Sequence, residues 1–312
     1  MTIMITLIAA MLAGTGFVLQ QHAAEQAPKS YFMRLRLIAS LAHRPRWLAG
    51  VGVMAAGQVL SAWAIGHVTL SVAEPLLTSS LIFALALAVP LSGQRLHATE
   101  ILGGVLLSGG VAALSLARTS GPPTESFGSF AAWPAAAGIA AVAGGFLVAG
   151  LSRTGQQRAT LTGAAAGLIF GISDALTRRA VEILDSHSVL ALLTGWPVYA
   201  VVVASLAGFW LMESAFSAAP LHASLPTITA AEPVAGMLLG VVVFGDVIHI
   251  SPGMLALQGA GLAALVLGVI LVARAPVLSR LGRPAAAKLA RPPGPRRAPA
   301  PVVPPGPTGP AV

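Results

Sequence analysis

Apolar runs of about twenty residues follow one another along most of the chain, and a helical run of that length spans the hydrocarbon core of a bilayer. In lipid, a single segment satisfies all of its own backbone hydrogen bonds only as a helix. The sequence therefore predicts an all-α, polytopic membrane protein with nine transmembrane helices. The predicted spans are Ile3–Gln20, Trp47–Gly66, Ser71–Leu91, Thr99–Ala117, Phe130–Leu151, Leu161–Ala180, Val189–Met212, His222–Phe244 and Met254–Ala273.

The scarcity of charge supports the same fold class. Only 9% of the residues are charged and the mean hydropathy is +0.83, whereas soluble domains carry about 25% charged residues. Cysteine is absent, which excludes disulfides and cysteine-based metal sites. No histidine pair has metal-ligand spacing and no nucleophile–base pair is recognisable. Neither an enzyme nor a bound cofactor is therefore predicted, and the sequence does not identify a metal.

Basic residues lie on alternate connections between the predicted spans. If nine helices alternate in direction, these residues fall on one side, which the positive-inside rule assigns to the cytoplasm. We expect a plasma (inner) membrane protein with its N-terminus outside and its C-terminus cytoplasmic. Topology and contact with anionic lipid explain the net charge of +8 better than nucleic acid does. The residues are Lys29, Arg34, Arg36, Arg44, Arg46, Arg95, Arg153, Arg158 and the cations of the tail from Arg274 to Arg297.

The second half of the chain resembles the first. Ala73-Glu74-Pro75 matches Ala231-Glu232-Pro233, and Gly93-Gln-Arg-Leu-His97 matches Gly245-Asp-Val-Ile-His249. Four predicted helices precede a fifth, which reverses the second copy, so the repeats are expected to be inverted in the membrane. The predicted parts are a first membrane repeat (1–118), a linking loop and fifth helix (119–158), a second repeat (159–275) and a disordered, basic, Pro-rich cytoplasmic tail (276–312).

One stretch of the second half carries a resemblance to a known family. Pro226-Thr-Ile-Thr-Ala-Ala-Glu232-Pro233, followed by Leu238 to Gly245-Asp246, resembles the second-half helix that ends in Gly-Glu in EamA-like members of the drug/metabolite transporter (DMT) superfamily. Asp246 replaces that Glu here, and the first half has Gly93-Gln94 without an acid. The layout is closest to the NIPA-type magnesium-transporter branch. The resemblance implies alternating-access transport or ion permeation.

The two Glu-Pro motifs supply the first candidate site residues. Glu74 and Glu232 each follow a hydroxyl residue by three positions, Ser71 and Thr229, and this spacing places each pair on one helix face. A carboxylate inside a membrane span indicates a functional site, here for a cation, a proton or a substrate amine. The alternative is a capping box with Pro in the first turn. For Glu232, a cap requires a helix that restarts inside the membrane, as in broken transporter helices.

Further polar residues in the spans complete the candidate set. Asp174 is the only Asp within a predicted span; it either contributes to the site or neutralises Arg178 as an i,i+4 pair. Gln58 is expected to hydrogen-bond inside the bundle, where it lines the cavity or joins helices. Glu213 is expected at the membrane interface. Gly163, Gly167 and Gly171, four residues apart, predict a close approach of two helix backbones.

These observations predict a secondary transporter that moves a small metabolite or a cation by alternating access. An alternative is a magnesium transporter of NIPA type, because magnesium keeps several waters and needs only one or two carboxylates. A less favoured alternative is a membrane scaffold or lipid-handling protein without transport activity. The expected partners are the lipid bilayer and the transported small molecule or cation, and a homodimer is compatible with this layout.

Overall fold

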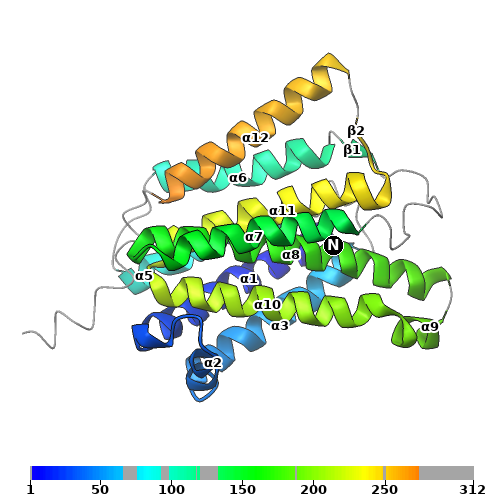
Figure 1. Cartoon of the computed structure of the whole chain (residues 1–312). Coiled ribbons are helices and arrows are strands. Elements are labelled where there is room, and N and C mark those ends of the chain that lie inside the picture. Colours follow the sequence, from blue (N-terminus) through cyan, green and yellow to red (C-terminus); the bar gives the residue numbers. More distant parts are fainter. Residues whose placement is uncertain are drawn as a thin grey trace, which may run out of the picture. The chain divides into compact units, whose positions relative to one another are not determined.

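The structure is a computed structural model of the whole chain, and nearly all of the described residues are helical (Figure 1). The long helices are α1 (Thr2–Glu25), α3 (Pro45–Ile65), α5 (Ser80–Ser92), α6 (Ala98–Leu116), α7 (Pro134–Leu151), α8 (Gly155–Ser186), α10 (Trp196–Ala218), α11 (Leu221–Phe244) and α12 (Pro252–Ala273). The structure describes residues 2–65, 76–92, 98–116, 118–119, 133–186, 188–248 and 251–273. The predicted tail lies outside these ranges.

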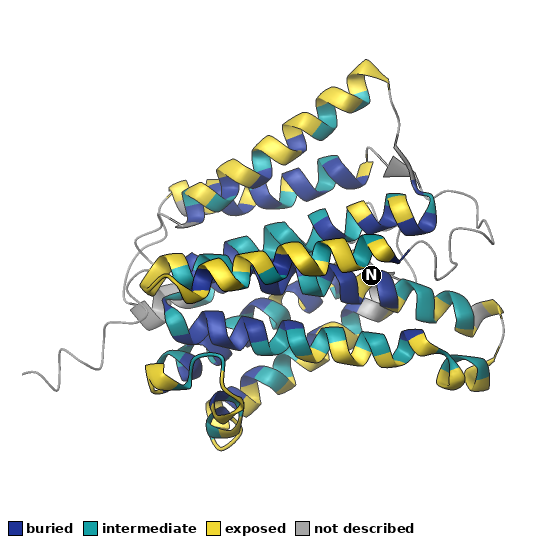
Figure 2. Cartoon of the chain, in the orientation of Figure 1, coloured by how far each residue is buried: buried dark blue, intermediate teal, exposed yellow. Residues whose placement is uncertain are grey.

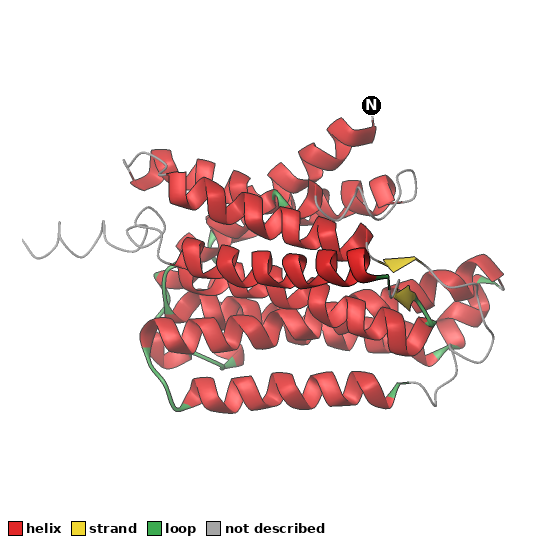
Figure 3. Cartoon of the chain, turned by 90° about the horizontal axis from the view of Figure 1, so that it is seen from above, coloured by secondary structure: helices red, strands yellow, loops and turns green. Residues whose placement is uncertain are grey.

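Short elements occupy several connections between the long helices. They are η1 (Lys29–Tyr31), α2 (Leu35–Leu41), α9 (Val189–Thr194) and the two-residue strands β1 (Arg118–Thr119) and β2 (Val247–Ile248). The strands pair antiparallel, with Arg118 opposite Ile248. Because α2 and the strand pair lie at opposite ends of the helices (Figures 1 and 3), we call these ends the α2 end and the β end.

The all-α class is confirmed, and each predicted span overlaps a helix. Among the described residues, six helices are long and apolar enough to cross a membrane, namely α1, α7, α8, α10, α11 and α12, and α6 contributes a shorter apolar segment. The chain is therefore a multi-pass membrane protein. The count of nine spans and the inverted repeat stay predictions.

The surface of the helices is apolar, as a lipid environment requires. Leucine and valine side chains such as Val148, Val203 and Leu206 are more than half exposed. Figure 2 shows exposed residues running along α7, α10 and α12, whereas α8 is largely buried. In water such a surface would drive aggregation, so the distribution of apolar residues agrees with the membrane assignment.

Helix α8 is the central element of the second half and contacts α7, α10 and α11. Its glycines allow the close approach to α11 that the four-residue spacing predicts. A Cβ added at Gly167 would lie 2.5 Å from the Ile228 carbonyl oxygen, and one at Gly171 would lie 2.5 Å from the Glu232 carbonyl oxygen. In the first half, α1 contacts α3 and α5. Helix α6 of the first half packs against α12 of the second half.

Helix α11 excludes one of the two alternatives for Glu232. It is continuous from Leu221 to Phe244 with Pro226 and Pro233 inside it, and it overlaps the predicted span His222–Phe244. Membrane helices tolerate proline when neighbouring groups satisfy the freed backbone atoms. The capping-box alternative requires a helix that restarts at Thr229, so that alternative is wrong.

The segment between α1 and α3 packs against the α2 end of the bundle. Leu37 and Leu41 of α2 are fully buried, and Arg44 Nη1 donates to the Ala23 carbonyl oxygen at 3.2 Å, near the end of α1. The Arg158 guanidinium at the start of α8 stacks 4.8 Å from the centre of the Phe32 ring. These contacts tie the segment to α1 and α8, and α2 also contacts α10.

Candidate functional site

Two carboxyl groups meet near the middle of the α8–α11 pair. Gly171 brings α8 against the backbone of Glu232, and Asp174 follows Gly171 by one turn. The Asp174 and Glu232 side chains share a hydrogen bond. Asp174 is exposed and Glu232 is partly exposed, whereas the neighbouring Ser173 and Ala175 are buried. Two carboxyl groups share a hydrogen bond only if one of them holds a proton, because an ionised carboxylate has no donor; a cation between them would take the place of that hydrogen bond.

Hydroxyl residues lie close in sequence to the carboxyl pair on α8 and α11, and one of them reaches α10. The Ser173 and Ser205 hydroxyls are 2.7 Å apart and join α8 to α10. Thr177 donates to the Ser173 carbonyl oxygen at 2.8 Å, and Thr229 donates to the Leu225 carbonyl oxygen at 2.9 Å. The Thr229 hydroxyl is thus committed as a donor to its own helix. Its oxygen lone pairs remain available to a cation or a proton donor, so the predicted pairing of Thr229 with Glu232 stays a prediction.

An ion-pair cluster closes the β end of α8 and α11. Arg178 donates through two nitrogens to Asp246 at 3.1–3.2 Å and pairs with Glu182 at 3.5 Å. Its guanidinium stacks 4.2 Å from the centre of the Phe244 ring. The Asp246 side chain is only 2% exposed, and it follows Gly245, which ends α11 in the left-handed conformation with a φ of 66°. We call Arg178, Glu182, Phe244 and Asp246 the Arg178 cluster.

The remaining predicted site residues are distributed differently. Gln58 lies on α3 with an exposed side chain, so the structure does not bear out the prediction that Gln58 hydrogen-bonds inside the bundle. Ser71 and Glu74 lie outside the described residues. Asp174 and Glu232 are the two predicted residues that the structure brings together. The sequence gives no signal for their contact beyond the glycine spacing, because 57 intervening positions separate them.

The described residues contain no group of three His, Cys, Asp or Glu side chains arranged to hold a metal ion. The carboxyl pair alone offers two acidic ligands from two helices. Such a pair suits a proton, a monovalent cation, an ammonium group or a hydrated divalent ion, and it repels an anion.

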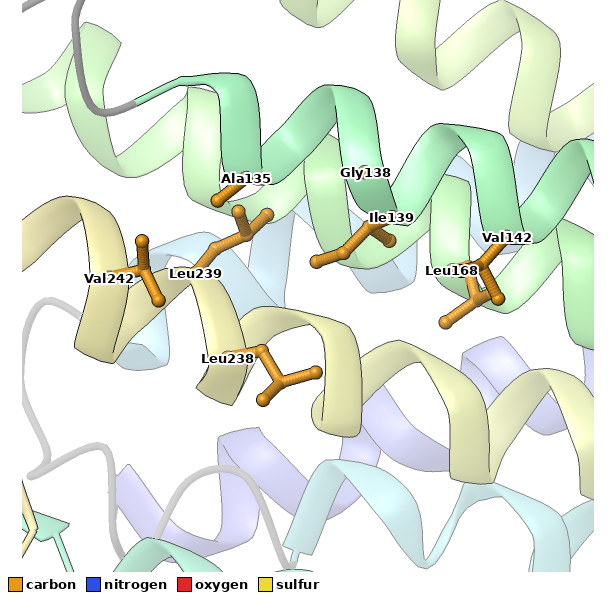
Figure 4. A pocket seen from close by; sticks show the side chains of 8 residues that line it. All are labelled: Ala135, Gly138, Ile139, Val142, Leu168, Leu238, Leu239 and Val242. Atoms are coloured by element: carbon orange, nitrogen blue, oxygen red, sulfur yellow. The ribbon is translucent and has the colours of Figure 1, made fainter.

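A groove on the outer side of the bundle has a different character (Figure 4). It encloses about 320 Å³ between α7, α8 and α11, and its lining side chains are all apolar. They are Ala135, Gly138, Ile139, Val142, Leu168, Leu238, Leu239 and Val242. With no polar group to orient a charged ligand, this groove does not extend the carboxyl site.

Comparison with known proteins adds one relative. The chain is 26% identical over 280 residues to an uncharacterised protein of Corynebacterium glutamicum, and the alignment covers 88% of this chain and 95% of that protein. The sequence matches no protein-family profile, and no solved structure matches the chain. The alignment therefore covers most of the chain, and the functional argument rests on the site itself.

Proposed function

We propose that this membrane protein is a secondary transporter that moves a small cationic metabolite or a cation by alternating access. The observation that carries the proposal is the hydrogen bond between Asp174 and Glu232 near the middle of two packed helices. Ionisable groups at that depth are costly and mark pathways for substrates, ions or protons. The pair balances one positive charge, so the transported species is positive or travels with a proton or cation.

The local structure of α11 supports movement at this site. Pro233 has no N–H to donate to the Thr229 carbonyl oxygen, so the helix lacks one of its hydrogen bonds next to Glu232. At Gly171, α8 presents no side chain to the backbone of Glu232. A small change in α11 at Pro233 would therefore move the Glu232 carboxyl relative to Asp174.

Magnesium is the second candidate substrate. Two carboxylates suffice for a magnesium ion that retains most of its water, and the carboxyl pair provides two. A scaffold or lipid-handling role is the third candidate, and the apolar groove is the feature that fits it.

The exposed charges favour one orientation. The α2 end carries the exposed cations Lys29, Arg34, Arg36, Arg46 and Arg153. At the β end, Arg178 and Arg179 are paired with acids. By the positive-inside rule, we place the α2 end in the cytoplasm, in a bacterial inner membrane.

Uptake into liposomes tests this function. Purified protein is assayed with magnesium, amino acids and cationic drugs, alongside Asp174→Asn and Glu232→Gln. Each variant should lose uptake of the transported species, because a neutral side chain cannot balance its charge. Glu25→Gln is the control: Glu25 lies at the end of α1 and accepts a hydrogen bond from Gln21 at 2.9 Å, which glutamine can also accept.

Wild-type uptake that survives in both Asp174→Asn and Glu232→Gln would remove the carboxyl pair from the mechanism. Uptake of magnesium, with no uptake of amino acids or drugs, would select the second candidate. Uptake of no solute at all, in liposomes that hold correctly folded protein, would favour the scaffold role.

A further inference from the structure

A third acidic residue lies inside the bundle, away from the carboxyl pair. Glu213 is on α10, five residues before the helix ends at Ala218 on the α2 end. Its side chain is 0% exposed, as are those of Met212 and Ser214. The sequence predicts an interfacial position for Glu213, and its place near the end of α10 is compatible with that depth, but its side chain is buried between helices. The sequence gives the depth of Glu213 along its helix, but burial is decided by which helix face packs against α1, α3 and α8.

Aromatic side chains lie near Glu213 on α10 and its neighbours. The Trp47 indole lies beside it, and the Trp47 ring packs edge-on against Phe209 with the ring centres 6.0 Å apart. One turn further, Phe216 packs against Phe17 of α1 at 6.4 Å. Neither oxygen of Glu213 nor Nε1 of Trp47 completes a hydrogen bond with any described group.

No charged group of the described residues compensates the Glu213 carboxyl. The helices in contact with α10 are α1, α2, α8, α9 and α11, with α3 reaching it through Trp47. The only side-chain interaction of the Glu213 carboxyl is with Trp47. The titratable groups of the neighbouring helices are engaged or exposed elsewhere: His22 with Gln26, Glu25 with Gln21, Arg158 with Phe32, Asp174 with Glu232, and Arg36 and Arg46 at the surface.

A carboxylate without a counter-charge or hydrogen-bond donors is not stable at a fully buried position, because its desolvation costs several kcal/mol. The carboxyl group is stable there when it holds its own proton. The Glu213 site has no accessible surface and no cation beside it. In this conformation it can hold a proton but no larger ligand.

We propose that Glu213 is a proton-binding site, which holds a proton in the closed bundle and releases it at the α2 end during the transport cycle. This inference rests on the proposed function. In the release step the Glu213 O–H bond breaks, its proton passes to a water molecule, and a carboxylate remains. Uptake is the reverse.

The surroundings provide a route for that water. Trp47 lies in the first turn of α3, directly after the segment that Arg44 ties to the end of α1. Displacement of the first turn of α3 would uncover Glu213 from the α2 end while Asp174 and Glu232 stay within α8 and α11. Glu213 would then exchange protons with one side of the membrane.

Infrared spectroscopy and transport test the proposal separately. In full-length Asp174→Asn/Glu232→Gln protein in liposomes, the carbonyl band of a protonated carboxylic acid should be present at neutral pH and lost on adding Glu213→Gln. This measurement needs no transport activity. In the otherwise wild-type chain, Glu213→Gln should abolish substrate accumulation driven by a pH gradient and retain exchange of substrate between equal pools, because glutamine mimics the protonated acid.

The experiments separate failure of the proton site from failure of the proposed transport function. If the infrared band does not depend on Glu213, or if Glu213→Gln accumulates substrate like the wild type, the proton site is refuted. Equal loss of accumulation and exchange would show a purely structural role and also refute it. A wild type that transports nothing refutes the proposed function, while the infrared band still tests the site.

Trp47→Phe provides a second variant in case Glu213→Gln does not fold. It keeps an aromatic ring beside the carboxyl and removes the indole N–H. The carbonyl band should persist, because Trp47 Nε1 completes no hydrogen bond with the carboxyl, and exchange should be retained. Loss of the band in folded Trp47→Phe protein would show that Glu213 does not hold a proton in the closed bundle and would overturn the proposal.

Discussion

Gly171→Ala tests the contact that positions the carboxyl pair. The added Cβ would lie 2.5 Å from the Glu232 carbonyl oxygen, 2.6 Å from Ala235 Cβ and 2.9 Å from the Gly236 nitrogen. Ordinary contact begins at 3.4 Å, so α8 and α11 must separate locally by about 0.9 Å. Neither the methyl group nor the backbone of α11 can rotate away. Overpacking of this kind costs about 1–3 kcal/mol.

The matched control is Gly145→Ala on α7, where an added Cβ meets nothing within 4 Å. Alanine favours the helix over glycine by up to about 1 kcal/mol at either position, so the control should be neutral or stabilising. Thermal unfolding of both variants in the same detergent gives the comparison. Gly171→Ala should unfold at a lower temperature than wild type and should also weaken uptake, because Glu232 moves with its backbone. If its unfolding temperature equals that of Gly145→Ala, the close α8–α11 contact is wrong.

Two further predictions concern the Arg178 cluster and the orientation of the chain. Asp246→Asn should destabilise the protein by about 1.5–3 kcal/mol, the usual worth of hydrogen bonds to a charged group, as measured by thermal unfolding, because Arg178 loses its buried partner. Arg179→Gln, which removes only a partly exposed pair with Glu182, should change stability by less than about 1 kcal/mol. The chain lacks cysteine, so Lys29→Cys and Ser186→Cys would each contain a single thiol. In intact cells an impermeant thiol reagent should label Ser186→Cys and spare Lys29→Cys; the opposite pattern would reverse the proposed orientation.

The sequence predicts the helices of this protein better than the contacts between them. Apolar run length locates the helices because lipid leaves a spanning segment few alternatives. The spacing of Gly163, Gly167 and Gly171 also predicts the α8–α11 approach correctly, since small residues four apart form one stripe on a helix. Both predictions depend on residues that are close together in the sequence, and such local patterns are retained in the folded chain.

Proline gives a weaker signal. Pro233 beside Glu232 leaves open whether the helix restarts there, and α11 continues through both Pro226 and Pro233. Proline removes a hydrogen bond and crowds the preceding turn. Whether the helix ends there depends on the packing around it, which here includes the whole length of α8. That packing is a tertiary property and cannot be read from the motif.

The sequence does not predict which side chains pair with each other across the fold. Arg178 is four residues after Asp174, so local spacing favours their pairing, yet Arg178 binds Asp246, which is 68 residues away. Asp246 is available because Gly245 turns the chain at the end of α11. Likewise, the position of Glu213 near the end of a span predicts depth, whereas the packing of α10 determines that its carboxyl is buried.

The small strand pair at the β end has a mechanical consequence. Gly103 of α6 lies against Gly268 of α12, and Gly110 lies against Gly261; beyond the helix ends, Arg118 pairs with Ile248 in the same antiparallel sense. The final helix of each half is thus fastened to its counterpart along its length and at its tip. A movement that separated α6 from α12 would have to break the Gly103–Gly268 and Gly110–Gly261 contacts and the strand pairing together.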